Sequence, residues 1–349
     1  MISRQITSVP DVLAAPNFDN LLQVLRCRQP SRATLFEFFL NGDLEERLAF
    51  GGKDARAATW PWHMVQALAF RKAGYDYLTV GVPGFAFPAG DRHRDRSISL
   101  NEGAMITDWA SFRAYPWPNP DDAQYGILDE VGNELADGMQ IIVCGPGGVE
   151  ENVISLVGYD NMCYMMADAP ELVEAIFEQI GSRLTRYYQH VAKHPRVGAC
   201  ISNDDWGFKT QTLLSLQQMH QYLFPWHRRI TEAVHDAGKP VILHSCGYYD
   251  DVIETVITDL HYDARHSYED NIRQVEEAYD QLHGRIAILG GVDLDFICRS
   301  TPEEVYTRAK AMLQRAVHGG YALGTGNSVP SYVPHDNYFA MLHAALEER

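Results

Sequence analysis

Pro240-Val241-Ile242-Leu243-His244-Ser245-Cys246-Gly247 is the stretch that decides the fold. Its unbroken apolar run, bounded by proline and glycine, predicts a short strand that is covered on both faces. Because side chains alternate along a strand, His244 and Cys246 point the same way and Ser245 points the opposite way. Both residues follow the carboxyl end of the strand, which is where parallel α/β folds build their active sites. An imidazole and a thiol together form half of a zinc site. The alternative is a packed histidine beside a buried free cysteine.

Helices and strands alternate on both sides of this stretch. Several helical patterns end at a glycine, and a strand pattern follows. Thr301-Pro302-Glu303-Glu304 is a typical helix start, with threonine as the cap and proline in the first position. The predicted strands cover residues 34–39, 75–81, 140–145, 197–205, 241–244, 261–266, 285–293 and 321–327. Eight strands in βα alternation without a linker predict a closed (β/α)8 barrel, the TIM barrel. We therefore expect one domain over residues 1–349.

Two segments do not follow this alternation. Residues 1–30 have amphipathic helical spacing and predict a helical cap before the barrel. Residues 82–138 are rich in proline, glycine, tryptophan and aspartate, which predicts a long insertion over the barrel mouth.

Composition excludes several classes of partner. The formal charge of −17 argues against nucleic acid and anionic membranes, which favour basic surfaces. No apolar run approaches the roughly 20 residues of a membrane helix, and the amino terminus lacks the apolar core of a signal peptide. The six cysteines are widely spaced without a CxxC motif. This usage indicates a reducing compartment, so we expect a cytoplasmic protein.

Seven stretches in the second half of the chain carry a family resemblance. They are Gly158–Met162, Asp168–Leu172, Ser202–Asp205, His235–Pro240, His244–Gly247, Gly290–Asp293 and Pro330–Pro334. Their order and residues resemble the uroporphyrinogen decarboxylase superfamily. That superfamily contains the decarboxylases themselves and zinc-dependent methyltransferases that serve corrinoid proteins. The resemblance covers about residues 155–345 and implies a TIM barrel.

Two motifs favour the methyltransferase branch. Phe36-Glu37-Phe38-Phe39-Leu40 stands where decarboxylases carry an arginine-rich motif for the porphyrinogen carboxylates. A site without those cations would reject such a substrate. His244 and Cys246 match the His-x-Cys-Gly motif with which the methyltransferases hold zinc. The family's third ligand, a cysteine after the last strand, is missing, and Asn327 or Ser328 stands in its region.

Other residues near strand ends could supply a replacement ligand. The candidates are Glu37, Asp205, His266, Glu269 and Asp293. Asp205 and Asp293 are also candidate catalytic groups that carry protons, and Glu37, His266 and Asn327 are candidate substrate contacts. Each candidate has an alternative role as a loop cap or as the partner of a nearby arginine. Cys298 fits a helix better than a ligand position.

The resemblance implies a methyltransferase that moves a methyl group between a small methylated substrate, such as a methyl ether, and a corrinoid. Zinc would act as a Lewis acid. The sequence has no D-x-H-x-x-G run to hold a corrinoid, so a separate corrinoid protein is the expected partner. A homodimer is a further option for assembly. The alternatives are a metal-independent decarboxylase of the uroporphyrinogen decarboxylase type and a binding protein on the same barrel.

Overall fold

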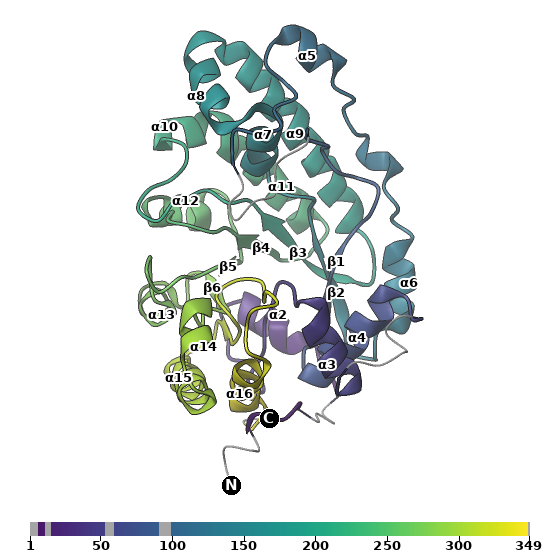
Figure 1. Ribbon diagram of the computed structural model, residues 1–349, viewed down its shortest axis with the longest axis vertical. Helices are drawn as coiled ribbons and strands as arrows, with labels where there is room; N and C mark the ends of the chain where they lie inside the picture. Colours follow the sequence, from purple (N-terminus) through teal and green to yellow (C-terminus); the bar gives the residue numbers. More distant parts are fainter. Residues whose placement is uncertain (1–5, 11–14, 53–58, 91–98, 348–349) are drawn as a thin grey trace.

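Seven parallel strands form one curled sheet in a computed structural model, which describes residues 6–10, 15–52, 59–90 and 99–347. Each strand pairs with the next one in sequence, from β1 to β7, and Figure 1 labels the first six of them. The strands are β1 (Tyr77–Gly81), β2 (Gln140–Cys144), β3 (Val197–Asn203), β4 (Val241–His244), β5 (Ala264–His266), β6 (Ala287–Leu289) and β7 (Tyr321–Ala322). Seven of the eight predicted strands are therefore confirmed.

Helices connect the strands and cover the sheet (Figure 1). They are α2 (Asp19–Leu25), α3 (Gly42–Phe50), α4 (Trp62–Ala73), α5 (Trp109–Ala114), α6 (Ile127–Glu134), α7 (Val149–Val157), α8 (Tyr159–Asp168), α9 (Pro170–Val191), α10 (Leu216–Gln218), α11 (Phe224–Asp236), α12 (Ile253–Thr258), α13 (Val275–Leu282), α14 (Leu294–Arg299), α15 (Pro302–Arg315) and α16 (His335–Leu346). Short turns add η1 (Pro120–Asp122), η2 (Met219–Leu223) and η3 (Asp250–Val252). Thr301 caps α15 with a capping box, as its sequence predicts. None of the described helices is both long enough and apolar enough to cross a membrane.

The predicted first strand, 34–39, does not form a regular strand, which corrects the prediction of an eight-stranded barrel. This segment makes one isolated bridge, from Leu35 to Leu323, and the next residue, Leu40, makes another to Val329. Beside β1, the Tyr77 hydroxyl occupies both main-chain groups of Glu37, with its oxygen 2.6 Å from the N–H nitrogen and 2.6 Å from the carbonyl oxygen. A side chain thus takes the hydrogen bonds that a neighbouring strand would make. The result is a seven-stranded sheet with an irregular eighth segment against β7.

A glycine permits the close approach of this segment to the last strand. The Phe36 N–H donates to the Leu323 carbonyl at 2.8 Å. A Cβ at Gly324 would lie 1.7 Å from the Phe36 carbonyl oxygen, so any larger residue would push the segment away. Segments far apart in the sequence, around Phe36 and around Leu323, therefore meet beside the sheet.

The central strand β4 is buried as its sequence predicts. Val241, Ile242 and Leu243 have no exposed surface. Parallel pairing places His244 beside Asn203 of β3 on one side and beside His266 of β5 on the other. These three polar residues end neighbouring strands, so the carboxyl edge of the sheet is polar at this point.

The amino-terminal helix lies at the other end of the strands. The Phe18 N–H donates to the Gly138 carbonyl, just before β2, at 2.9 Å. The Asn17 N–H donates to Asp76, just before β1, at 2.8 Å. The cap expected over residues 1–30 is thus represented by α2 at the amino-terminal edge of the sheet, and α2 does not cover the His244 end. Residues 1–5 and 11–14 of that segment lie outside the described residues.

The 82–138 segment packs along the outside of the helices. The Met105 N–H donates to the Leu156 carbonyl of α7 at 2.7 Å. Asp121 of η1 forms an ion pair with Arg186 of α9 at 2.9 Å, and α6 contacts α4 and β2. The described part thus contacts α4, α7, α9 and β2, and its position over the barrel mouth stays a prediction. Residues 91–98 lie outside the description.

A candidate metal centre at the end of β4

Asp205, His244 and Cys246 form a cluster at the carboxyl edge of β3 and β4. One ligand atom of each lies within 4.8 Å of those of the other two. The Cys246 sulfur is 3.8 Å from His244 Nε2, and the Cys246 N–H donates to Asp205 Oδ1 at 2.7 Å. Ser245 points away and accepts from the Trp206 N–H at 3.2 Å, as strand alternation predicts. Of the described residues, only these three form such a cluster.

A close contact between two loops brings Asp205 to Cys246. Gly247 has a φ of 80°, which favours glycine. A Cβ there would lie 2.0 Å from the Gly207 carbonyl oxygen. The Tyr248 N–H also donates to the Phe208 carbonyl at 2.6 Å. The loops that follow β3 and β4 are thus fastened together directly behind the cluster.

The Cys246 sulfur accepts hydrogen bonds from two side chains of other strand ends. Asn327 Nδ2 lies 3.2 Å from the sulfur, and Ser267 Oγ lies 3.8 Å from it. Burial, together with the Asp205 carboxylate, raises the pKa of the Cys246 thiol well above its usual value. Without a cation the thiol therefore keeps its proton at neutral pH. This disfavours a free nucleophilic cysteine, which needs a lowered pKa.

His244 has a second histidine behind it. Its Nδ1 lies 2.7 Å from Nδ1 of His266, and His266 Nε2 lies 3.4 Å from the Thr325 carbonyl oxygen. Burial lowers the pKa of His244 well below its usual value and that of His266 to about 4, so both rings are neutral at pH 7. Phe38 packs against the His244 ring and Phe36 against the His266 ring.

Glu37 is buried beneath the same loop. Its two carboxyl oxygens lie 2.8 Å from the Thr325 nitrogen and 2.6 Å from the Thr325 hydroxyl oxygen. Burial raises the pKa of Glu37 to about 8. The Thr325 hydroxyl also lies 2.5 Å from the Asn327 carbonyl oxygen. Since one hydroxyl has one proton, a neutral Glu37 that donates to Thr325 lets Thr325 donate to Asn327.

The three predicted substrate contacts, Glu37, His266 and Asn327, therefore lie in two different environments. Asn327 reaches the Cys246 sulfur. Glu37 and His266 are each 0% exposed and lie behind the cluster. Their burial leaves no surface for contact with a substrate in this conformation.

Asp293 has the geometry of a loop cap. Its two carboxylate oxygens accept from the Phe296 N–H at 2.8 Å and the Asp270 N–H at 2.9 Å, so it starts α14. Glu269 lies near Asp293 and Asp205, and burial raises its pKa. Cys298 lies on α14, as its sequence favoured. None of these three belongs to the metal-ligand cluster found among the described residues.

Further acids at the end of β3 were not singled out from the sequence. Asp204 accepts from the N–H groups of Glu150 and Glu151, and from His227 Nε2 at 2.9 Å. Burial raises the pKa of Glu151 to about 8, and it raises the pKa of Glu150 as well. The Asp204-Asp205 pair was visible in the sequence. Its contacts were not, because Glu150 and Glu151 of α7, whose N–H groups bind Asp204, lie more than 50 positions away. Carboxyl groups therefore surround this edge of the sheet, which suits a bound cation.

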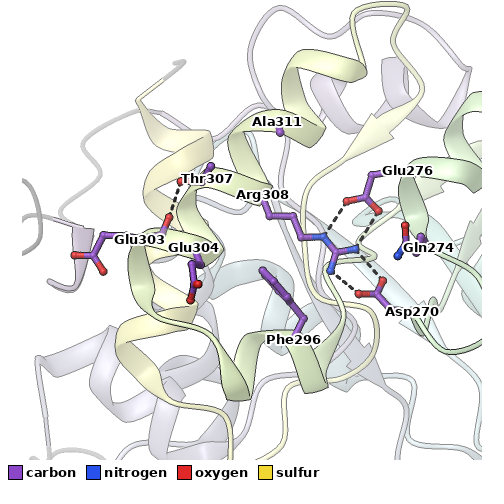
Figure 2. Close-up of a pocket in the computed structure, with 9 residues that line it drawn as sticks. All are labelled: Asp270, Gln274, Glu276, Phe296, Glu303, Glu304, Thr307, Arg308 and Ala311. Atoms are coloured by element: carbon purple, nitrogen blue, oxygen red, sulfur yellow. Dashed lines mark hydrogen bonds and ion pairs between the residues drawn. The ribbon is translucent and has the colours of Figure 1, made fainter.

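A separate pocket of about 670 Å³ lies between α13, α14 and α15 (Figure 2). Arg308 points between Asp270 and Glu276 and pairs with both carboxylates at 2.6–3.0 Å. Its guanidinium also lies over the Phe296 ring. The polar groups at the centre of this pocket are thus paired with one another. None of the three cluster residues lines it.

A family model and the solved structure of a methyltransferase agree with the fold. The family model for uroporphyrinogen decarboxylase (URO-D) matches residues 126–347. The solved structure of a methyltransferase from Methanosarcina mazei superposes with a TM-score of 0.69 at 15% identity, covering 96% of this chain and 99% of that one. The β-glycosidase from Thermosphaera aggregans gives a TM-score of 0.46 at 11% identity, covering 91% and 97%. No curated protein sequence matches the chain.

Proposed function

Since the chain belongs to the uroporphyrinogen decarboxylase family, we propose that it is a zinc-assisted methyltransferase. It moves a methyl group between a small methylated substrate, such as a methyl ether, and a corrinoid carried by a separate protein. The single observation that carries this proposal is the cluster of Asp205, His244 and Cys246. The structural likeness to a methyltransferase supports the fold on which the cluster is built.

The three donor groups fit zinc. Thiolate sulfur, imidazole nitrogen and carboxylate oxygen are the ligands that zinc binds in proteins. With zinc bond lengths, a tetrahedral site needs about 3.6 Å between sulfur and nitrogen. The 3.8 Å between Cys246 Sγ and His244 Nε2 is close to that separation. Asp205 thus replaces the cysteine that this chain lacks after its last strand.

Each residue has a distinct part in such a site. Zinc would supply a Lewis acid that activates a thiol or the oxygen of a methyl ether. Asp205, His244 and Cys246 would hold it. Asn327 and Ser267 donate hydrogen bonds to the Cys246 sulfur and orient it. A bound cation would favour the ionised forms of these crowded carboxyl groups, whereas a substrate with many carboxylates would add to their repulsion.

The corrinoid belongs to a partner in this proposal. A D-x-H-x-x-G run, by which corrinoid modules bind their cofactor, is absent from the sequence. The methyl group must nevertheless come within bonding distance of the acceptor. The partner therefore docks at the carboxyl edge of the sheet, and it leaves again after each transfer.

Metal content and methyl transfer test the proposal together. The purified protein should contain about one zinc per chain. It should transfer the methyl group of a methyl ether to added cob(I)alamin, or to a cognate corrinoid protein in its cobalt(I) state, with release of the corresponding alcohol. Removal of zinc by a chelator should abolish the transfer, and added zinc should restore it. A metal-free protein that decarboxylates a porphyrinogen would overturn the proposal in favour of a decarboxylase. Ligand binding without turnover, with a corrinoid partner present, would indicate a binding protein.

A further inference from the structure

We propose that His266 is a positioning residue that determines which nitrogen of His244 faces the metal position. The inference rests on the proposed metal site, and it concerns a residue outside the ligand set. His266 is fully buried on β5, directly beside His244 on β4. Its effect on a metal would pass through a single contact, the 2.7 Å pair of Nδ1 atoms.

The direction of this hydrogen bond follows from the Thr325 carbonyl. A carbonyl oxygen only accepts, so His266 Nε2, which lies 3.4 Å from it, carries a proton. Nδ1 of a neutral His266 then has a lone pair. It accepts the proton of His244 Nδ1. His244 Nε2 is consequently unprotonated, and this is the nitrogen 3.8 Å from the Cys246 sulfur.

The opposite arrangement is unfavourable. If His244 Nδ1 accepted from His266 Nδ1, a neutral His266 would have no proton on Nε2. Two acceptors, His266 Nε2 and the Thr325 oxygen, would then face each other in a site with no exposed surface. His244 Nε2 would in turn carry a proton and have no lone pair for a metal. Leaving buried polar groups unpaired is costly, so the first arrangement is preferred.

The surroundings of His266 hold this arrangement in place. Phe36 packs against its ring with the centroids 5.1 Å apart. Gly290 lies beside the ring: a Cβ there would be only 3.1 Å from His266 Nε2 and 2.2 Å from the Thr325 carbonyl oxygen, so a larger residue would disturb the pair. Glu37 holds Thr325 through two hydrogen bonds. The chain of contacts therefore runs from Glu37 through Thr325 and His266 to His244.

Two substitutions separate this role from simple packing. His266→Leu removes the acceptor, whereas His266→Asn keeps an oxygen near the position of Nδ1. We expect His266→Leu to weaken zinc binding 10–100-fold, the usual range for a lost partner of a ligating histidine, and His266→Asn to restore most of it. Zinc affinity is measured by competition with a chromophoric chelator. The visible spectrum of the cobalt(II)-substituted protein should change in His266→Leu and remain close to wild type in His266→Asn.

The matched control is Asn337→Leu, which removes another buried side chain with two hydrogen bonds, to the Ile297 and Ser300 carbonyls outside the cluster. It should lower the melting temperature without altering the cobalt spectrum. Equal zinc affinity in wild type and His266→Leu would overturn this inference alone. A wild-type protein without affinity for zinc would instead overturn the proposed function.

Nitrogen-15 NMR of the wild-type histidines tests the inference even if the His266 variants do not fold. The expected spectrum has protons on His244 Nδ1 and His266 Nε2. A proton on His266 Nδ1 would contradict the assignment.

Discussion

Cys246 is the residue whose loss should affect the site most. Its sulfur lies beside His244 and accepts hydrogen bonds from Asn327 and Ser267. Cys246→Ala should reduce bound zinc from about one per chain to a trace, with methyl transfer lost in parallel. Cys298→Ala is the matched control, because Cys298 is a half-buried cysteine on α14 outside the cluster. Metal analysis of both variants gives the result, and stoichiometric zinc in Cys246→Ala would refute the assignment.

Asp205 can be tested without disturbing the loop that holds it. Asp205→Asn keeps an oxygen that accepts from the Cys246 N–H, but it removes the charge. We expect the variant to fold normally and to bind zinc at least about tenfold more weakly, because a neutral amide is a poor zinc ligand. Chelator competition measures the change. Unaltered affinity would show that the third ligand lies elsewhere.

Glu37 should make the protein less stable as the pH rises. Its pKa is about 8 in the folded protein, against an ordinary value of 4.5, and burial is the main cause. The folded state thus holds a proton that the unfolded chain releases above about pH 4.5. The contribution of protonated Glu37 to the free energy of unfolding is therefore full below pH 4.5, and it is lost as the pH rises through 8. At about 1.4 kcal/mol per pKa unit, the loss is on the order of a few kcal/mol.

Glu37→Gln should flatten this dependence, because glutamine stays neutral and can still accept from the Thr325 N–H. Urea unfolding at several pH values measures it, with Glu303→Gln, on an exposed part of α15, as the control. Identical slopes for wild type and Glu37→Gln would mean that Glu37 is ionised in the folded protein.

At the scale of the elements, Gly247 controls how the loops after β3 and β4 meet. Gly247→Ala places a Cβ 2.0 Å from the Gly207 carbonyl oxygen at a φ of 80°. Gly238→Ala has a similar φ of 72° with nothing within 4 Å, so it isolates the backbone strain from the contact. We expect Gly238→Ala to cost about 1 kcal/mol and Gly247→Ala about 1–3 kcal/mol more, with weaker zinc binding. Thermal unfolding and zinc titration provide the comparison, and equal effects in both variants would contradict it.

The sequence predicted those elements whose signals are local. The apolar run before His244, the alternation to Cys246 and the capping box at Thr301 each depend on a few neighbouring residues. The segment 34–39 was misassigned because a distant side chain, the Tyr77 hydroxyl, takes its hydrogen bonds. Asp205 was one of five equal candidates, since its contact with Cys246 depends on how two loops pack. The pairing of His244 with His266 depends on strand register, which sequence patterns do not give.

At the scale of the whole molecule, the formal charge of −17 bears on partner recognition. A corrinoid protein that docks on this chain should have a basic rim, and salt screens such attraction. Methyl transfer to the corrinoid protein should therefore slow as NaCl rises from about 50 to 500 mM, whereas transfer to free cobalamin should change little. Initial rates with both acceptors test this. Equal salt dependence would exclude electrostatic docking.

The contact between Glu37 and Thr325, 288 positions apart, has a consequence for synthesis of the protein. Parallel strands in sequential order allow β1 to β6 to pair one after another as the chain leaves the ribosome. The segment around Leu35 must wait for Leu323 before it finds its place. Its apolar side chains, Leu35, Phe36 and Phe38, are buried in the folded protein, and they lack part of their cover until then, which favours aggregation of an incomplete chain. The candidate metal centre is completed only when residues near 325 have emerged, and a shorter nascent chain would not hold the metal in its final geometry.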